Sequence, residues 1–458
     1  MKIRNRSELL SHGNVRGRKI ALKIAEYALK KLNGYDALRE IIKIRDETLD
    51  IGVLELDLSK YSNIYVVGAG KASMGIAKAL EQTLGNRIRE GVIVVKEGQF
   101  EKLSRIEVVE AGHPLPNQSG FNASNRILQI ADKATEKDLV FGIITGGSSA
   151  LMARPVEGIS LEDERKATEL LLKCGATMFE MNAVRRHISA TNGGRLAQRI
   201  QPAELINFLI SDSIGDAPIM DPWKPRAFQG TPVGTDPTTF RDAVSVLKKY
   251  RLYEKFPQSI KSHLERGTPA METPKSFDGM KIITFVLRNP ADASRYAMQA
   301  AQELGLNSII LSSMIEGESR EAGAVLAGIA KESEKTSNPV GPPCVLVCAG
   351  ETTVTIEEEC GEGGPSQELA LGFSTKINEK NNIVALALDT DGTDGPTDIA
   401  GGIVDGYTMC RAEDMGMDIH SALAQHNSSA VLRELDDAIF TGVTNTNVCD
   451  LNLIVILR

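Results

Sequence analysis

Two glycine-rich turns carry the clearest chemical signals in the sequence, and the first is Gly68-Ala69-Gly70-Lys71. Its glycines let backbone N–H groups approach an anion, a following helix adds positive potential, and a lysine stands at the same place. The turn lacks the dinucleotide-binding fingerprint, because Ser73 replaces the required Gly or Ala. It also lacks the Walker A pattern, because Ala72 follows the lysine. The remaining interpretations are an anion-handling turn or a plain strand–helix turn with a solvated lysine.

The second turn, Gly146-Gly147-Ser148-Ser149, follows the apolar run 139–145. Two glycines and two hydroxyl groups can cradle a phosphate or a carboxylate. A plain turn with a serine helix cap accounts for the same residues. A nucleophilic serine is disfavoured, because the Gly-x-Ser-x-Gly elbow is absent.

Carboxylates follow two further apolar runs. Asp212 comes after the run 205–211, and Asp389 and Asp391 open an acidic loop after the run 383–388. Carboxylates in such loops can hold Mg²⁺ or accept a proton. The second loop begins like a calcium-binding EF-hand loop, but Asp394 stands where that loop requires glycine. A metal or nucleotide role and simple turn capping are the two interpretations.

His113 and Arg195 complete the set of candidates. His113 precedes a proline, which favours an extended backbone, and a structural role is the alternative to a catalytic one. Arg195 follows a pair of glycines and could clamp a carboxylate, although surface charge explains many such arginines. Glycine turns, a lysine, carboxylates and arginines together favour phosphoryl transfer, in which the protein positions reactants and neutralises charge.

These residues need a framework of strands and helices. The sequence predicts a βαβ unit at 63–67, 72–84 and 91–95, in which a strand runs into the Lys71 turn. Buried strands that end in small or polar loops are the ligand-binding edge of open α/β sheets. Further strands are expected at 139–145, 205–211, 281–287, 307–311, 344–348, 352–356, 383–388 and 453–457, and helices before about 45 and at 161–174, 240–250, 291–304, 318–334, 366–376 and 421–432.

The 458 residues predict two or three domains. We place a boundary in the run that follows Gly267, which gives domains 1–275 and 276–458. The composition, with 42% hydrophobic and 24% charged residues, is that of a globular protein. The net charge of −8 disfavours nucleic acid as a partner. No run approaches the roughly 18 apolar residues of a membrane span, and no secretory signal is visible. We therefore expect a cytoplasmic protein with no membrane partner, whose six cysteines are reduced thiols.

An ordered set of segments resembles the class II glycerate kinases, whose C-terminal portion is called the MOFRL domain. The resemblance spans nearly the whole chain and is far more specific than any single motif. It runs through 68–72, 111–116, 145–150, 209–212 and 230–240 in the first half, and through 350–354, 363–364, 367–370, 391–395 and 444–450 in the second.

The resemblance implies an N-terminal Rossmann-like parallel sheet with helices on both faces. It further implies a smaller C-terminal α/β domain, with the MOFRL region at about 343–455, and an active-site cleft between the two domains. The implied reaction transfers the γ-phosphate of ATP to the 2-hydroxyl of D-glycerate, with Mg²⁺ or another divalent cation. Lys71 matches the lysine regarded as catalytic in the family. Many members carry arginine where this chain has Pro365, so that Arg195 or Arg288 takes over its role or the role is not needed.

We predict catalytic roles for Lys71, which would stabilise charge on the transferred phosphoryl group, and for Asp212. The competing functions are an NAD(P)H-dependent hydroxypyruvate reductase and a non-catalytic phosphometabolite-binding protein. The expected partners are D-glycerate and ATP, and a homodimer is compatible with the sequence. Predicted phosphate- or glycerate-binding residues are Gly68, Gly70, His113, Gly146, Gly147, Ser148, Ser149 and Arg195; predicted nucleotide-binding residues are Glu351, Gln367 and Asp391; predicted metal ligands are Asp212 and Asp389.

Overall fold

The computed structural model describes residues 2–215, 219, 224–226, 230–356 and 360–458, and the chain divides into two compact units. We call residues 34–210 and 220–287 the parallel-sheet unit. Residues 1–33, 211–219 and 288–458 form the mixed-sheet unit. The division differs from the predicted domains 1–275 and 276–458, because the first 33 residues and the segment after Ile210 belong with the C-terminal half.

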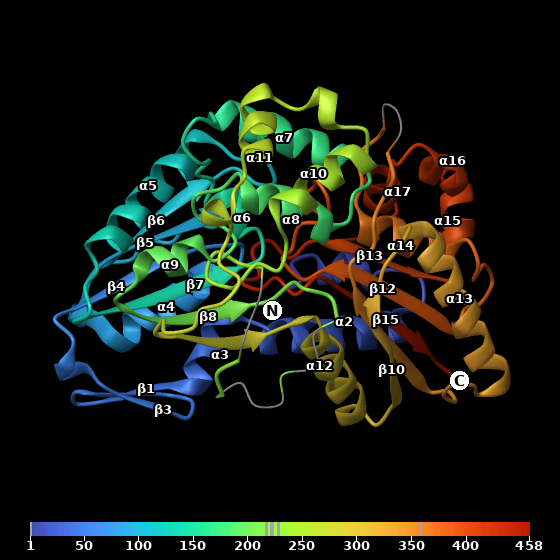
Figure 1. Cartoon of the computed structure of the whole chain (residues 1–458). Coiled ribbons are helices and arrows are strands. Elements are labelled where there is room, and N and C mark those ends of the chain that lie inside the picture. The colour runs from blue at the N-terminus through green and yellow to red at the C-terminus, as the bar shows by residue number, and fades with distance from the viewer. Residues whose placement is uncertain (1, 216–218, 220–223, 227–229, 357–359) are drawn as a thin grey trace. The chain divides into compact units, whose positions relative to one another are not determined.

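Six strands form the parallel sheet, in the order β6-β5-β4-β7-β8-β9 (Figure 1). Helix α4 (Ser73–Leu84) connects β4 to β5, and α5 (Gln118–Lys133) connects β6 to β7. The crossover from β4 to β5 moves toward β6, and the crossover from β6 to β7 moves toward β9. Because crossovers between parallel strands are right-handed, α4 and α5 lie on opposite faces of the sheet. The strands are β4 (Asn63–Ala69), β5 (Ile88–Lys96), β6 (Ile106–Ala111), β7 (Asp138–Thr145), β8 (Glu204–Ile210) and β9 (Ile282–Arg288).

Four helices of the parallel-sheet unit enclose a hydrophobic core of their own. Phe240, Leu247 and Ile260 are buried at its centre. The chain between these helices carries the Gly193–Gly194 pair and the short helix α9 (Arg195–Ile200). The four helices are α7 (Leu161–Lys173), α8 (Met178–His187), α10 (Phe240–Lys249) and α11 (Gln258–Glu265).

The mixed-sheet unit has a six-stranded sheet in the order β10-β11-β15-β12-β13-β14. The pair β10–β11 is parallel and the other neighbours are antiparallel. The predicted fold class, α/β with a parallel sheet and a separate C-terminal α/β unit, is thus confirmed. The strands are β10 (Asn307–Ile315), β11 (Cys344–Gly350), β12 (Ile383–Asp389), β13 (Gly401–Asp405), β14 (Ala438–Ile439) and β15 (Asp450–Ile456).

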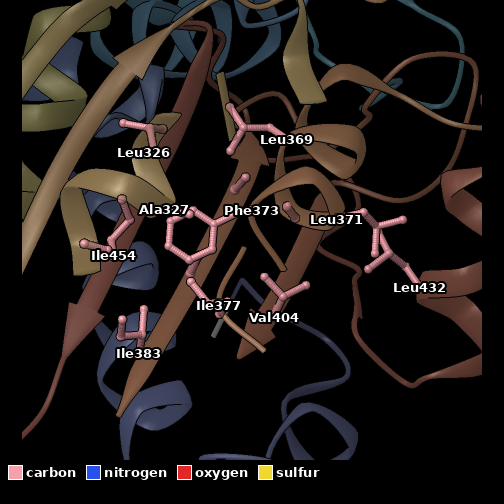
Figure 2. Close-up of a cluster of buried hydrophobic side chains, with 14 of the residues drawn as sticks. Leu326, Ala327, Leu369, Leu371, Phe373, Ile377, Ile383, Val404, Leu432 and Ile454 are labelled. Atoms are coloured by element: carbon pink, nitrogen blue, oxygen red, sulfur yellow. The ribbon is translucent and has the colours of Figure 1, made fainter. Parts of the chain in front are cut away.

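Successive side chains of each strand point to opposite faces of this sheet, and helices pack against the apolar groups on both faces. On one face, Leu369 and Phe373 of α14 pack with Ile454 and Ile383 of the strands (Figure 2). On the other face, α2 (Val15–Lys31) comes so close to Val384 that a Cβ on Gly17 would lie 2.5 Å from its Cγ2. The other helices of the unit are α1 (Arg6–Leu9), α12 (Pro290–Glu303), α13 (Ser319–Thr336), α14 (Pro365–Ser374), α15 (Thr408–Asp414), α16 (Ile419–Ala424) and α17 (Ser428–Glu434).

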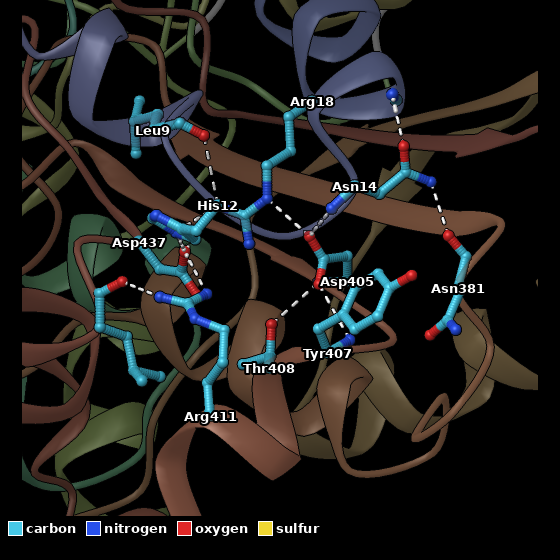
Figure 3. Close-up of polar contacts among 12 residues, drawn as sticks. Leu9, His12, Asn14, Arg18, Asn381, Asp405, Tyr407, Thr408, Arg411 and Asp437 are labelled. Carbon is cyan, nitrogen blue, oxygen red and sulfur yellow. Dashed lines mark hydrogen bonds and ion pairs between the residues drawn. The ribbon is translucent and has the colours of Figure 1, made fainter. Parts of the chain in front are cut away.

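A buried ion network attaches the N-terminal residues to the mixed sheet. Arg18 is fully buried and donates from Nε to Asp405 and from Nη1 to Asp437, both at 2.6 Å (Figure 3). His12 lies 2.8 Å from Asp437, and Arg411 lies 3.2 Å from it. A fully buried arginine requires such compensation, so these contacts explain why residues 1–33 belong to the mixed-sheet unit.

The structure differs from three of the predicted elements. The helical prediction before residue 45 fails after Ile41, where β1 (Ile42–Arg45), β2 (Thr48–Ile51) and β3 (Leu54–Asp57) form a small antiparallel sheet. No strand covers the described residues 352–356, of which only Thr353 makes an isolated bridge. The helix predicted at 421–432 is two helices, α16 and α17, because His426 between them has φ +52, which α-helical geometry does not allow.

Candidate active site

The two glycine turns meet where the strand order of the parallel sheet reverses. Strands β4 and β7 are parallel neighbours, with β5 and β6 on one side and β8 and β9 on the other. Lys71 follows β4, Gly146 follows β7, and the main-chain N–H of Lys71 donates to the carbonyl oxygen of Gly146 at 2.9 Å. Open α/β sheets bind ligands outside the carboxyl ends of the strands at such a switch point.

Close packing explains why the first turn needs its glycines. Gly70 has φ +139, and a Cβ there would lie 2.0 Å from Thr145 Oγ1. The same hydroxyl oxygen accepts the N–H of Ala72 at 3.0 Å. At Gly68 a Cβ would lie 2.1 Å from the carbonyl oxygen of Ile143. The backbone on both sides of Lys71 is therefore fixed against the end of β7.

His113 and Lys71 flank the second turn. Gly147 has φ +84, and a Cβ there would lie 3.0 Å from His113 Nε2 and 3.3 Å from Lys71 Cγ. Gly147 leads into the short helix α6 (Ser148–Leu151), in which Ser148 is buried and Ser149 half-buried. The structure thus brings most of the predicted phosphate-binding residues into one cluster, the Lys71 cluster, made of Gly68, Gly70, Lys71, His113, Gly146, Gly147, Ser148 and Ser149.

Arg195 belongs to a different network of the same unit. Its Nη2 donates to the carbonyl oxygen of Met271 at 2.8 Å, and burial lowers the pKa of its guanidinium despite the nearby carboxylates of Glu272 and Asp236. Asp236 also pairs with Arg186 at 3.2 Å. These contacts hold the segment around 230–240, and phosphate or glycerate binding by Arg195 stays a prediction.

Carboxyl groups gather at one edge of the mixed sheet. Asp450 begins β15 and pairs in register with Gly350 on one side and with Asp389 on the other, so that Glu351 also lies at this edge. Cys449 donates from Sγ to the carbonyl oxygen of Asp212 at 2.9 Å and lies 3.9 Å from Glu351 Oε2. Three residues predicted to bind metal or nucleotide therefore lie together. We call Asp212, Glu351, Asp389 and Asp450 the carboxylate cluster.

The carboxylate cluster carries an excess of negative charge. Burial raises the pKa of Asp450 well above its ordinary value, and the carboxylates of Asp389, Asp394 and Glu351 raise it further. Burial and the carboxylates of Glu351 and Asp212 likewise raise the pKa of the Cys449 thiol. A bound proton or cation stabilises such a cluster. The sequence prediction missed Asp450, although the register of two adjacent strands places it there.

The carboxylate cluster offers carboxylate oxygens that can act as ligands for a cation. In the part of the chain that the structure describes, no group of three or more His, Cys, Asp or Glu side chains is arranged to hold a metal ion. Mg²⁺ is commonly bound through one or two carboxylates together with waters and substrate phosphates. Asp212 and Asp389 offer oxygen ligands of this kind, and Asn447 orients Asp212 by donating to its Oδ2 at 3.2 Å.

Gln367 is buried and hydrogen-bonded within the protein. Its side-chain nitrogen donates to the carbonyl oxygen of Asp394 and to the hydroxyl of Thr397, and its side-chain oxygen accepts from Ser429 at 2.7 Å. Asp394 in turn accepts the first N–H groups of α14, and burial raises its pKa to about 7. Gln367 therefore fixes the acidic loop to α14. In that loop, Asp391 accepts from the backbone and hydroxyl of Thr393.

Pro365 supplies no cation at the start of α14, and the replacement of the family arginine by Arg288 stays a prediction. Pro365 is the first residue of that helix, where its fixed φ suits a helix start. Arg288 is almost fully buried and donates from Nε to the carbonyl oxygen of Lys31 at 2.8 Å. Its guanidinium also lies 5.6 Å from the ring centre of Tyr296. These contacts account for Arg288 within the packing of the mixed-sheet unit.

Comparison with known proteins identifies the family. Residues 20–265 match the family described as a domain of unknown function, DUF4147, and residues 344–450 match the MOFRL family. A glycerate 2-kinase of Pyrococcus horikoshii is 39% identical over 432 residues, which cover 94% of this chain and 95% of that protein. The chain belongs to the class II glycerate kinase family.

A solved structure and a further curated relative of this glycerate kinase family member are also similar to it over most of the chain. The crystal structure of glycerate kinase from Thermotoga maritima is 34% identical with a TM-score of 0.77, covering 96% of this chain and 99% of that one. A protein of Agrobacterium vitis, provisionally named a hydroxypyruvate reductase, is 36% identical and covers 85% of this chain and 86% of its own. None of the described helices is both long and apolar enough to cross a membrane.

Proposed function

We propose that this chain is an ATP-dependent glycerate 2-kinase, which transfers the γ-phosphate of ATP to the 2-hydroxyl of D-glycerate and yields 2-phosphoglycerate and ADP. One observation carries the proposal. This chain, which is 39% identical over almost its whole length to a glycerate 2-kinase, carries a lysine in a glycine turn at the switch point of its parallel sheet. Phosphoryl transfer requires positioning and charge neutralisation, which such a turn supplies.

Within the Lys71 cluster, the roles follow from charge and position. The ammonium group of Lys71 neutralises charge that develops on the transferred phosphoryl group. The backbone of Lys71 is fixed beside the end of β7, and this positions the side chain. The backbone N–H groups and hydroxyls of Ser148 and Ser149 donate to phosphate or glycerate oxygens. His113 restrains the second turn by packing against Gly147.

The carboxylate cluster would hold the divalent cation. Asp212 and Asp389 are its ligands in this proposal, together with oxygens of the nucleotide. A bound Mg²⁺ would neutralise phosphate charge. The protein's part is to orient these carboxylates: Asn447 donates to Asp212, and the backbone N–H of Asp391 donates to Asp389 at 2.9 Å.

A reductase is the competing function, since the Agrobacterium vitis relative carries that name. The turn that would bind a nicotinamide dinucleotide has Ser73 at the third position of the fingerprint, where the fold usually needs Gly or Ala for close helix–strand packing. Ser73 is buried and donates from Oγ to the carbonyl oxygen of Gly70 at 2.7 Å. This bond stabilises the turn around Lys71.

Two parallel assays separate these functions. In the first, the protein is incubated with ATP, Mg²⁺ and D-glycerate, and ADP release is followed by a coupled assay. In the second, it is incubated with hydroxypyruvate and NADH or NADPH, and cofactor absorbance is recorded. We expect glycerate-dependent ADP release and no cofactor oxidation. Cofactor oxidation without ATP would establish the reductase, and ligand binding without turnover in either assay would favour a non-catalytic binding protein.

A further inference from the structure

The first residues of the chain lie along the loop that precedes β15 in the mixed-sheet unit. The backbone N–H of Arg4 donates to the carbonyl oxygen of Phe440 at 2.7 Å. Asn5 donates from Nδ2 to Ala438 and accepts the N–H of Phe440. Lys2 donates from Nζ to the carbonyl oxygen of Thr444 at 3.1 Å. With Ile3 buried beside them, these contacts fix the backbone of residues 2–5 in place.

The side chain of Arg4 packs against Gly442, which in turn contacts Gly392. A Cβ on Gly442, which has φ +64, would fall 2.0 Å from Nη2 of Arg4 and 2.3 Å from its Cζ. The carbonyl oxygen of Gly442 would in turn be 2.1 Å from a Cβ on Gly392, which has φ +97. Gly392 follows Asp391 in the acidic loop. Packing contacts therefore lead from the Arg4 guanidinium to Gly442, and from Gly442 to Gly392 in the acidic loop, which starts at the carboxylate cluster.

Arg4 is an exposed cation that lies against Gly442, the glycine that contacts the acidic loop at Gly392. Its side chain is exposed and makes no hydrogen bond or ion pair with any residue that the structure describes. A guanidinium presents donors in a planar fork that matches two oxygens of a phosphate group. The carboxylates at this edge of the sheet would repel a polyphosphate, and a cation near the acidic loop would offset that repulsion.

We propose that Arg4 binds the phosphate chain of the nucleoside triphosphate substrate. The proposal rests on the proposed function, in which the acidic loop and the carboxylate cluster handle the nucleotide and its metal ion. Glycine at 392 and 442 allows the arginine to approach the loop, and the fixed backbone of residues 2–5 reduces the entropy lost when the fork binds. Arg4 thereby contributes to the affinity for ATP and to its preference over AMP.

The test compares Arg4→Ala with the matched control Arg16→Ala. Arg16 is also an exposed arginine of the same unit and has no hydrogen bond or ion pair with a described residue, so its replacement removes the same charge. Steady-state kinetics give KM for ATP and for D-glycerate, and titration calorimetry gives Kd for ATP and for AMP. A charge-assisted contact predicts a rise of about tenfold or more in KM and Kd for ATP in Arg4→Ala.

The proposal expects no change in KM for D-glycerate, little change in Kd for AMP, and wild-type behaviour of Arg16→Ala. Arg4→Lys should recover only part of the ATP affinity, because it restores the charge without the fork. Equal ATP constants in Arg4→Ala and Arg16→Ala, or a selective rise in KM for D-glycerate, would overturn the inference. Failure of the proposed function has a different signature, namely a wild-type protein that releases no ADP with D-glycerate. A wild-type protein that does not bind ATP at all would overturn both.

Discussion

The main-chain N–H of Lys71 donates to the carbonyl oxygen of Gly146 at 2.9 Å, across the ends of two neighbouring parallel strands. This bond joins the two glycine turns that the sequence presents 75 residues apart, counted from Lys71 to Gly146. It also fixes the backbone from which the lysine side chain extends. The position of Lys71 therefore depends on β7 as much as on its own strand, so that the lysine and its support can be altered separately.

Replacing Lys71 by alanine should lower kcat by about 100- to 1,000-fold, the usual cost of removing one group that stabilises charge in the transition state. The fold should persist, because the bond from Lys71 to Gly146 is made by the main-chain N–H and is retained in the variant. Steady-state kinetics and circular dichroism measure both effects. Lys78→Ala is the matched control, since Lys78 lies on the following helix in an exposed pair with Glu101. Near-wild-type kcat in the Lys71 variant would refute its catalytic role.

Thr145→Val should weaken the support of the turn. The Thr145 hydroxyl accepts the buried N–H of Ala72, and leaving that group unpaired costs about 1–3 kcal/mol. We expect a lower free energy of unfolding in urea and a lower kcat, because the backbone next to Lys71 loses its anchor. Thr145→Ser retains the oxygen and should stay close to wild type. If Val and Ser variants behave alike, the hydroxyl does not hold the turn.

Arg18→Met should destabilise the mixed-sheet unit by about 3–5 kcal/mol, because it leaves the buried carboxylates of Asp405 and Asp437 without their main counter-charge. Burial alone would raise the pKa of Asp437, and Arg18, with His12 and Arg411, holds it below its ordinary value. Urea denaturation measures the loss. The exposed control Arg16→Met should change the free energy of unfolding by less than about 0.5 kcal/mol. Equal effects of the two variants would contradict the role given to the Arg18 network.

Glu164 should make stability depend on pH. Burial raises its pKa to about 7, against an ordinary value of 4.5, although Arg185 and Arg154 act in the opposite direction. Between pH 4.5 and about 7 the carboxyl group of Glu164 is protonated in the folded chain and ionised in the unfolded chain. Its contribution to the free energy of unfolding is therefore complete below pH 4.5 and is lost as pH rises through 7.

Glu164→Gln removes this titration. Relative to wild type, the variant should gain stability between pH 5 and pH 8, at roughly 1.4 kcal/mol for each pH unit crossed between the two pKa values. Urea denaturation at the two pH values measures the gain. Glu162→Gln, an exposed change on the same helix, should show a constant difference from wild type. A constant difference for Glu164→Gln as well would show that its carboxyl is ionised at both pH values.

Periodicity and turn chemistry predicted the sheet that positions the site. Strands β4, β7 and β8 are buried along nearly their whole length and read as apolar runs between glycine or polar turns, which is why their positions were predicted within one residue or two. The small sheet β1–β3 escaped prediction because each strand has only four residues, too few for a clear alternation.

The contacts of the site that join residues far apart in the sequence could not be predicted from local patterns. Lys71 and the Gly146–Gly147 turn each carry a local signal, but nothing local to either shows that Lys71 bonds Gly146. Asp450 ends one of the segments that carry the family resemblance, 444–450, but only the pairing of β15 with both β11 and β12 places it between Gly350 and Asp389. No local pattern shows that Arg18 is buried, because its two partners lie about 400 residues away in sequence.

The most direct test of the account is the identity of the product. The wild-type protein is incubated with ATP, Mg²⁺ and D-glycerate, and the phosphorylated product is examined by ³¹P and ¹H NMR. The account predicts phosphate coupled to the proton on carbon 2, which identifies 2-phosphoglycerate, and ADP in equal amount. Phosphate coupled to the protons on carbon 3, or no phosphorylated glycerate at all, would contradict it.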